Sequence, residues 1–139
     1  MASGMLTNPG STSHGKIRSH AFEVYKLAWK WQITTTKIAM YAAKNKEYIG
    51  LAAEPYLMMA GYITLAEHWL RMENVAAKAL GNSGLNPKEK DFYEGKVKAA
   101  AFYFDNVLPR VMSLSARMLA DERSTMSMTP SQFAYTDDE

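Results

Sequence analysis

None of the 139 residues of this chain is cysteine. This absence excludes a disulfide scaffold, a thiolate-ligated zinc or iron–sulfur site and a thiol nucleophile. Long hydrophobic runs are missing too: the longest apolar stretch, residues 56–66, is shorter than the about 20 residues that span a bilayer. The first residues lack the apolar core of a secretory signal. We therefore expect a soluble, cytoplasmic protein without a transmembrane segment.

The chain also lacks an excess of charge of one sign. Lys and Arg together number 16 and Asp and Glu 14, which gives a formal net charge of only +2. Such a balance gives no reason to expect a nucleic-acid partner. Apolar residues make up 47% of the chain and charged residues 22%, which indicates a globular domain rather than a disordered chain.

Motifs of catalytic and metal chemistry are absent as well. The three histidines are His14, His20 and His68, and none of them follows a glutamate by three residues, as the Glu-x-x-His pair of di-iron bundles requires. The sequence contains no nucleophile elbow and no phosphate-binding glycine loop. From the residues alone we predict no catalytic, cofactor-binding or metal-binding residue in this chain.

Composition divides the chain into three parts. Residues 1–17 are rich in small and polar residues without periodicity, so we expect a flexible leader there. Helical periodicity follows and predicts one helical domain over residues 18–124. Residues 125–139 end in two aspartates and a glutamate and are expected to form an acidic tail.

The first predicted helix covers residues 19–46. A set of mainly apolar residues recurs at steps of three and four, which places them on one face that is expected to meet the core; they are Phe22, Tyr25, Trp29, Ile33, Thr36, Met40 and Ala43. A row of lysines occupies another side, at Lys26, Lys30, Lys37 and Lys44. Such a row is more often a solvated face, although phosphates, acidic lipids or an acidic protein are possible partners.

The second helix is predicted to begin near Pro55, after a turn over residues 48–51, because proline is favoured in a first turn. Its predicted core face consists of Met58, Tyr62, Leu65, Trp69, Met72, Ala76 and Ala79. The opposite stripe is polar and consists of Thr64, Glu67, Arg71, Asn74 and Lys78. This division is typical of a bundle helix with one buried side.

The third helix has the clearest start signal, with Asn86 as cap, Pro87 in the first position and Glu89 in the third. Its predicted core face consists of Phe92, Tyr93, Val97, Ala100, Phe104, Val107, Val111, Leu114 and Met118. Pro109 falls inside this pattern and predicts a kink. The predicted fold is therefore all-α: an up-down bundle of three long helices, the last kinked at Pro109 into two segments, similar to a four-helix bundle.

Five residues are predicted as interface candidates. Trp29 and Trp31 lie about 200° apart around their helix, so one of them is expected to point outward. Met59, Ile63 and Leu70 widen the apolar side of the second helix beyond its core face. Exposed tryptophan and wide apolar surface are typical of protein interfaces.

Two segments resemble a known family. Asp91 to Pro109 resembles the signature F-Y-x-x-K-x-x-x-A-x-F-Y-x-x-x-x-L-P, and residues 55–62 (PYLMMAGY) resemble the segment P-Y-L-x-x-x-G-x. Both are found in a helical module that closes certain bacterial acyl-CoA dehydrogenase-like flavoenzymes, including the 3-methylmercaptopropionyl-CoA dehydrogenase type. The resemblance covers residues 20–125 of this chain.

The resemblance implies that FAD, the acyl-CoA thioester and the catalytic glutamate belong to domains that precede this module. No position here matches a catalytic or flavin-binding residue of the family. We therefore expect a detached C-terminal domain, inactive and without cofactor by itself, that packs on the catalytic flavoprotein domains or forms a homo-oligomer and so supports subunit association. Two alternatives stay open: a stand-alone binding or adaptor bundle, and a small bundle enzyme or metal protein.

Overall fold

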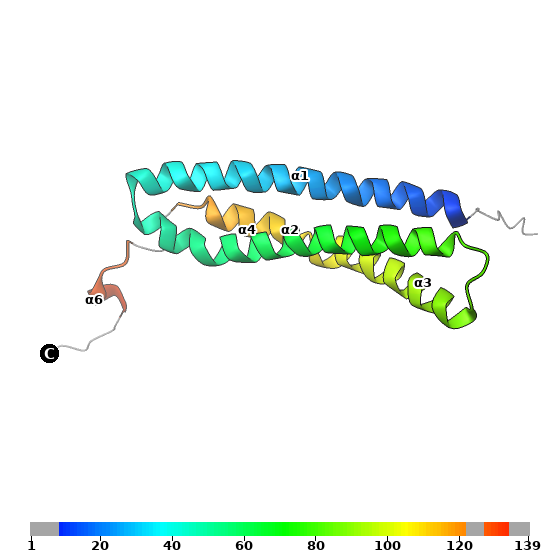
Figure 1. Cartoon of the computed structure of the whole chain (residues 1–139). Coiled ribbons are helices and arrows are strands. Elements are labelled where there is room, and N and C mark those ends of the chain that lie inside the picture. The colour runs from blue at the N-terminus through cyan, green and yellow to red at the C-terminus, as the bar shows by residue number, and fades with distance from the viewer. Residues whose placement is uncertain (1–8, 122–126, 134–139) are drawn as a thin grey trace, which may run out of the picture.

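The computed structural model describes residues 9–121 and 127–133, and all regular elements within these ranges are helical (Figure 1). In chain order they are α1 (Pro9–Lys44), α2 (Glu47–Leu80), α3 (Pro87–Phe102), the π-helix η1 (Tyr103–Val107), α4 (Arg110–Met118) and the short α6 (Pro130–Phe133). The predicted all-α fold, with three long helices of which the last is bent, is confirmed.

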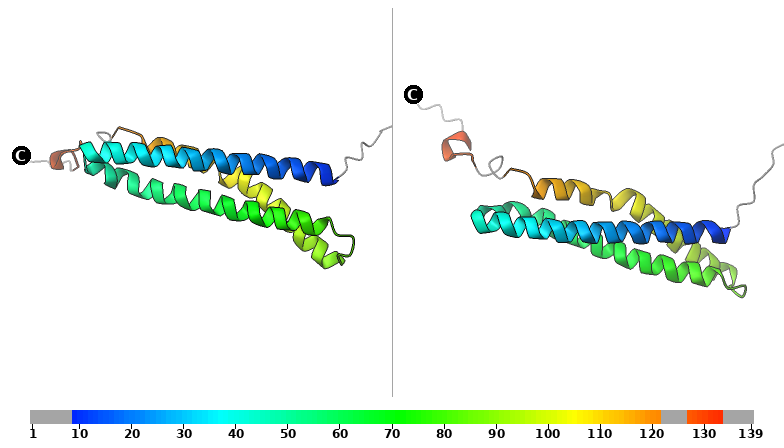
Figure 2. Two further views of the ribbon diagram at one scale, coloured as in Figure 1. Left: turned by 45° about the horizontal axis from the view of Figure 1, so that its top comes forward. Right: turned by 90° about the horizontal axis from the view of Figure 1, so that it is seen from above.

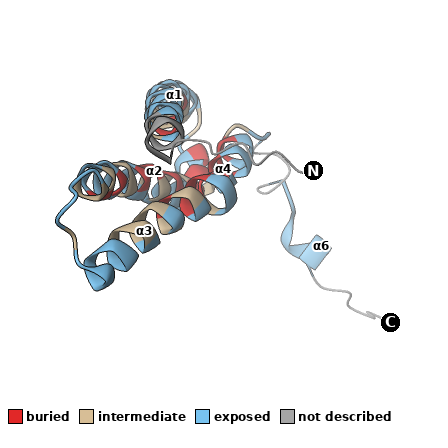
Figure 3. Cartoon of the chain, turned by 90° about the vertical axis from the view of Figure 1, so that its right-hand side faces the viewer, coloured by how far each residue is buried: buried red, intermediate tan, exposed pale blue. Residues whose placement is uncertain are grey.

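The central helix of the bundle is α2. It packs against α1, α3 and α4. We call the consecutive segments α3, η1 and α4 the third arm; among them, α1 contacts mainly α4. The start of α3 diverges from α1, and α1 runs along one corner of the bundle (Figure 2, Figure 3). One side of α1 therefore contacts the other helices, and its opposite side faces solvent.

The bend of the third arm begins in η1, directly before Pro109. The Leu108 N–H donates to the Tyr103 carbonyl at 2.9 Å, one residue further back than in an α-helix. Pro109 has no N–H to donate, and α4 begins at the next residue, Arg110. The predicted kink at Pro109 is confirmed, and the π-helical turn precedes it.

The predicted start of α3 is also confirmed. The Asn86 side chain accepts a hydrogen bond from the Glu89 N–H at 2.9 Å, and the Glu89 carboxylate accepts one from the Asn86 N–H at 3.1 Å. Pro87 takes the first helical position. This reciprocal capping satisfies two backbone donors that a helix start otherwise leaves without partners.

The core lies between α2 and its three neighbours. Its fully buried large residues are Met59 of α2 and Val111 and Met118 of α4. Two tyrosines tie the layers together by hydrogen bonds to backbone: Tyr48 donates to the Met118 carbonyl at 2.6 Å, and Tyr103 donates to the carbonyl of residue 62 at 2.7 Å. These bonds satisfy the hydroxyls inside an apolar contact.

Two predicted boundaries are wrong. Residues 9–17 do not form a leader, because α1 begins at Pro9; residues 1–8 lie outside the described part. The turn over residues 48–51 is also wrong, because α2 begins at Glu47 and Pro55 lies within it. The chain instead reverses at residues 45–46, where the Asn45 side chain accepts the Glu47 N–H at 3.0 Å. Of the predicted acidic tail, residues 125–126 and 134–139 lie outside the described residues.

The side of α1 predicted to face the core faces solvent instead. Its large members are between 42% and 70% exposed; they are Phe22, Tyr25, Trp29, Ile33 and Met40. The side that packs on the bundle consists of His20, Val24, Leu27, Trp31, Thr34 and Ile38. The two sides point in directions about 200° apart around the helix axis. Both are apolar, so periodicity alone did not distinguish them.

The predicted core face of α2 is displaced by about one residue. Met58, Leu65 and Met72 are exposed, whereas Met59 and Ile63 are buried. The predicted polar stripe of α2 is exposed throughout. On the third arm the predicted face is largely confirmed, since Ala100, Phe104, Val111, Leu114 and Met118 are buried, while Phe92 is 59% exposed.

Candidate interface and a buried histidine–glutamate pair

A buried polar pair joins α1 to α2. Nδ1 of His20 lies 2.8 Å from Oε2 of Glu73, and their side chains are only 10% and 2% exposed. Burying a carboxylate without a partner is strongly unfavourable. Each side chain is therefore satisfied by the other only when α1 and α2 are aligned as they are here, so the pair helps to fix the register of the two helices.

Phe104 of η1 completes this cluster. Its ring stacks on the His20 imidazole, with centroids 4.1 Å apart and planes 4° apart. Because the π-helical turn shifts the side chains that follow it relative to an α-helix, η1 helps to determine which residue meets His20. The cluster thus ties together three segments that are far apart in the sequence.

An open hollow of about 430 Å³ lies beside this cluster, between α1 and the bend. Glu23 and Asp105 contribute carboxylates to its lining, but Glu23 already pairs with Lys26 at 2.7 Å. Ser19 also lines the hollow, and no hydrogen bond joins it to His20 within the described residues. Ser19 and His20 therefore do not form a nucleophile–base pair in this structure.

The described residues contain no group of three His, Cys, Asp or Glu side chains that could hold a metal ion. Tyr103 has a clearly changed acidity. Desolvation by burial, together with a smaller contribution from the neighbouring Tyr62, raises the pKa of Tyr103 to about 12. Its hydroxyl is thus a neutral donor at physiological pH, committed to the carbonyl of residue 62.

The solvent side of α1 carries an apolar stripe, which we call the outer stripe: Phe22, Tyr25, Trp29, Ile33 and Met40. Single exposed apolar residues are common, but a continuous row of large ones indicates an interaction site. Lys26, Lys30, Lys37 and Lys44 of α1 run along one edge of this stripe, as their helical spacing requires. The outer stripe is the candidate interface of this domain.

The structure separates the five predicted interface candidates. Trp29 is 63% exposed and lies in the outer stripe, while Trp31 packs against the core, so one tryptophan does point outward as predicted. Met59 and Ile63 are 0% and 4% exposed, and Leu70 is half-buried against the core. These last three pack within this chain's own bundle and are not presented on its surface.

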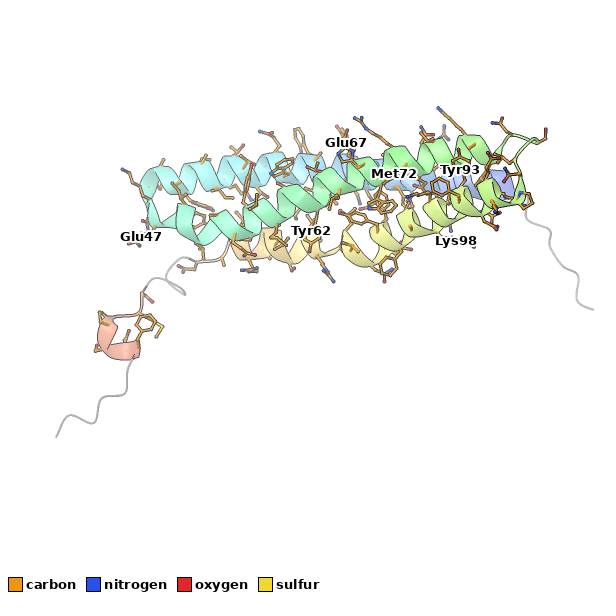
Figure 4. All side chains as sticks on the ribbon, turned by 60° about the horizontal axis from the view of Figure 1, so that its bottom comes forward. Glu47, Tyr62, Glu67, Met72, Tyr93 and Lys98 are labelled. Carbon is orange, nitrogen blue, oxygen red and sulfur yellow. The ribbon has the colours of Figure 1, made fainter. Side chains whose placement is uncertain are left out.

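A second apolar surface lies between α2 and α3. Figure 4 shows this side of the bundle, with Met72 of α2 and Tyr93 of α3 labelled. An apolar groove of about 350 Å³ lies here, lined by both residues together with Val75 and Phe92. Val75 and Phe92 are 62% and 59% exposed.

Comparison with known proteins assigns the chain. The profile of the family described as "Acetyl-CoA dehydrogenase C-terminal like" matches residues 9–129. The chain belongs to this family. It is also 28% identical over 126 residues to a protein named "Butyryl-CoA dehydrogenase" from Syntrophomonas wolfei, a match that covers 91% of this chain and 20% of that protein. No solved structure matches.

This acyl-CoA dehydrogenase C-terminal-like chain thus spans about a fifth of the length of its curated relative. The resemblance predicted from the sequence is confirmed. The segment that carried it, residues 91–109, forms most of α3, all of η1 and the bend. Its aromatic and Leu-Pro positions include Tyr103, Leu108 and Pro109, which lie at the bend rather than at a catalytic constellation.

The domain contains one helix, among those the structure describes, that is long and apolar enough to cross a membrane by length and composition: α2. This helix packs against α1, α3 and α4, and apolar residues on several sides are typical of a helix with several neighbours. Glu73 lies within α2, and its burial beside His20 shows that this helix is matched to protein neighbours.

Sequence reasoning missed the His20–Glu73 pair. A signal for it was present: Glu73 lies at helical spacing from Met59, Ile63 and Ala66, on the buried side of α2. An acidic residue inside an apolar stripe indicates a buried partner, because a carboxylate is rarely buried alone.

Proposed function

We propose that this chain is the non-catalytic C-terminal helical domain of an acyl-CoA dehydrogenase-type flavoenzyme, which packs on the catalytic flavoprotein domains and supports subunit association. The observation that carries the proposal is the family match over residues 9–129, in a chain that equals a fifth of the butyryl-CoA dehydrogenase it matches. The enzyme to which this domain would belong is soluble and cytoplasmic.

The side chains support a structural role. The buried acid, Glu73, is committed to His20, and Glu67 is exposed in a contact with Arg71 on its own helix. A carboxylate that removes a proton from a substrate must be free to reach it. FAD and the acyl-CoA thioester would accordingly be held by the preceding domains, while this domain contributes apolar surface.

A replacement experiment tests the proposal. The matching fifth of the Syntrophomonas wolfei butyryl-CoA dehydrogenase is deleted in one variant and replaced by residues 9–129 of this chain in another. We expect the deletion to lower the thermal stability and the butyryl-CoA oxidation activity of the enzyme. The replacement should restore a substantial part of both, because a packing domain acts through its surface.

A matched control replaces the same segment by an unrelated three-helix bundle of similar length, which should restore neither property. If the deletion variant keeps full stability and activity, the packing role is wrong. The chain would then be better described as a stand-alone binding or adaptor bundle.

A further inference from the structure

We propose that the outer stripe of α1 is a contact surface between two copies of this chain, which pair antiparallel across a two-fold axis near position 31. The inference rests on the subunit association in the proposed function and specifies its surface and register. It starts from the outer stripe itself, which spans about 27 Å along α1 at 1.5 Å per residue and whose five residues are 42–70% exposed.

The outer stripe is complementary to the outer stripe of a second, antiparallel copy. Phe22 and Met40 lie nine residues on either side of position 31, and Trp29 and Ile33 lie two residues on either side. In an antiparallel pair with this register, Phe22 and Trp29 of one copy meet Met40 and Ile33 of the other. Such pairs of large and smaller residues interdigitate well across a helix contact.

Tyr25 lies on the side of the outer stripe that is away from the lysine row. In the same register its ring would lie near Thr36 and Ala39 of the other copy, whose small side chains leave room for it.

The available area reaches the lower bound for a specific interface. An aromatic side chain has about 150–250 Å² of surface, and the three aromatic residues of the outer stripe are 61–70% exposed. With Ile33 and Met40, each copy offers on the order of 500 Å², so that two copies reach about the 1,000 Å² that a specific interface needs.

The two edges of the stripe differ. One edge carries small exposed residues, Ala21, Ala28 and Ala39, which allow close approach of a second helix. The other edge carries the lysines. In an antiparallel two-fold pair equal edges meet, so the lysine rows of the two copies lie near each other at the rim. Their repulsion is weakened by salt, and we therefore expect self-association to strengthen as salt concentration rises.

The salt dependence of binding distinguishes a second copy of this chain from an acidic protein or an anionic membrane. An acidic protein surface or an anionic membrane would bind the lysine edge less tightly at high salt. Sedimentation equilibrium of the full chain, over a concentration series at low and high salt, measures the effect directly. We expect a mass that rises from 15.6 kDa towards twice that value, at lower protein concentration when salt is high.

Matched substitutions test the surface. Trp29→Gln should raise the dissociation constant by about tenfold or more, because a central tryptophan dominates such contacts. Phe102→Gln is the control, since Phe102 of α3 is 62% exposed, like Trp29 at 63%, but lies outside the stripe; it should change the constant by less than about twofold. Both residues are exposed, so neither change is expected to disrupt folding, and circular dichroism checks this.

The natural absence of cysteine makes the register testable. Phe22→Cys and Met40→Cys variants, mixed and oxidised, should form a mixed disulfide, and neither should readily link to itself, because a disulfide needs Cα atoms within about 7 Å. Self-linking of Phe22→Cys alone would indicate parallel pairing and overturn the inference. A chain that stays monomeric at all concentrations and salts would also overturn it, whereas the packing role is judged separately by the replacement experiment.

Discussion

His20 of α1 and Glu73 of α2 are joined by a hydrogen bond of 2.8 Å inside the bundle, where Glu73 is 1% exposed. The contact helps to decide which side of α1 faces inward. If α1 were rotated to bury the outer stripe, Glu73 would lose its partner inside an apolar contact. A buried carboxylate without a partner is strongly destabilising, so this rotation is unfavourable.

Replacing Glu73 by alanine is expected to lower the free energy of unfolding by roughly 3 kcal/mol, because it removes a buried hydrogen-bonded partner and leaves the His20 imidazole unsatisfied. Chemical denaturation monitored by circular dichroism measures this. Glu67→Ala is the matched control on the same helix: Glu67 is exposed and contacts only Arg71 in its ion pair, so we expect a change within about 0.5 kcal/mol.

Equal effects of the two substitutions would contradict a structural role for the buried pair. The double variant His20→Phe with Glu73→Leu provides a second check. It replaces both polar partners by apolar ones of similar size, and such replacements are often neutral or stabilising. We expect it to be more stable than Glu73→Ala.

Tyr103 makes stability depend on pH in the alkaline range. Its pKa is raised from 10.0 to about 12, first by burial and then by Tyr62. Above pH 10 the unfolded chain loses the Tyr103 proton while the folded chain keeps it. The contribution of this group is therefore fully present below pH 10 and is lost as pH rises towards 12.

Tyr103→Phe should flatten this alkaline loss of stability, because phenylalanine does not titrate. At neutral pH the variant is expected to be about 1 kcal/mol less stable than the natural chain, since the hydrogen bond to the carbonyl of residue 62 is lost. Urea unfolding at a series of pH values measures both effects. Tyr25→Phe, at a 70% exposed position, should leave the slope unchanged; an equal flattening there would exclude burial as the cause.

The periodic signals of the sequence predicted the number of long helices, the capping box at Asn86 and the bend at Pro109, because each depends on local chemistry. They were wrong where two sides of one helix fitted the pattern of a buried face equally well. α1 is apolar on both sides, so the choice between Trp29 and Trp31 as the inward residue depends on contacts with α2 and η1. These tertiary contacts are not encoded in the spacing of α1 itself.

The start of α2 shows a second kind of failure. Gly50 and Pro55 are typical of turns and helix starts, yet both lie inside α2. The helix continues because Tyr48 and Ala52 are buried in the core, where Tyr48 also bonds to the Met118 carbonyl. Tertiary packing therefore outweighed local preference at the start of α2. Glu73 was missed for a related reason, because the sequence search considered acidic residues as exposed groups and did not consider a partner from another helix.

The isolated chain is expected to bind no FAD and to oxidise no acyl-CoA. The physical reason is the commitment of its polar side chains: the buried acid is paired with His20, and the hollow beside it is lined partly by Glu23 and Asp105, whose negative charge would repel the phosphates of either molecule. Absorbance of the purified protein after incubation with FAD, and dye reduction with butyryl-CoA, measure the two activities. Flavin bound near stoichiometry would contradict this prediction.

Replacing Pro109 by alanine tests how the bend is maintained. Alanine restores a backbone donor and removes the ring that clashes with the preceding turn, so η1 can extend towards a regular α-helix. Straightening the arm would pull Val111 and Met118 from their buried positions and separate Phe104 from His20. The regained hydrogen bond and the lost packing oppose each other, and we expect the free energy of unfolding to change by about 1–2 kcal/mol in either direction. The chemical shifts of the His20 ring protons report directly on its stacking with Phe104. Unchanged shifts together with unchanged stability would show that tertiary packing maintains the bend without Pro109.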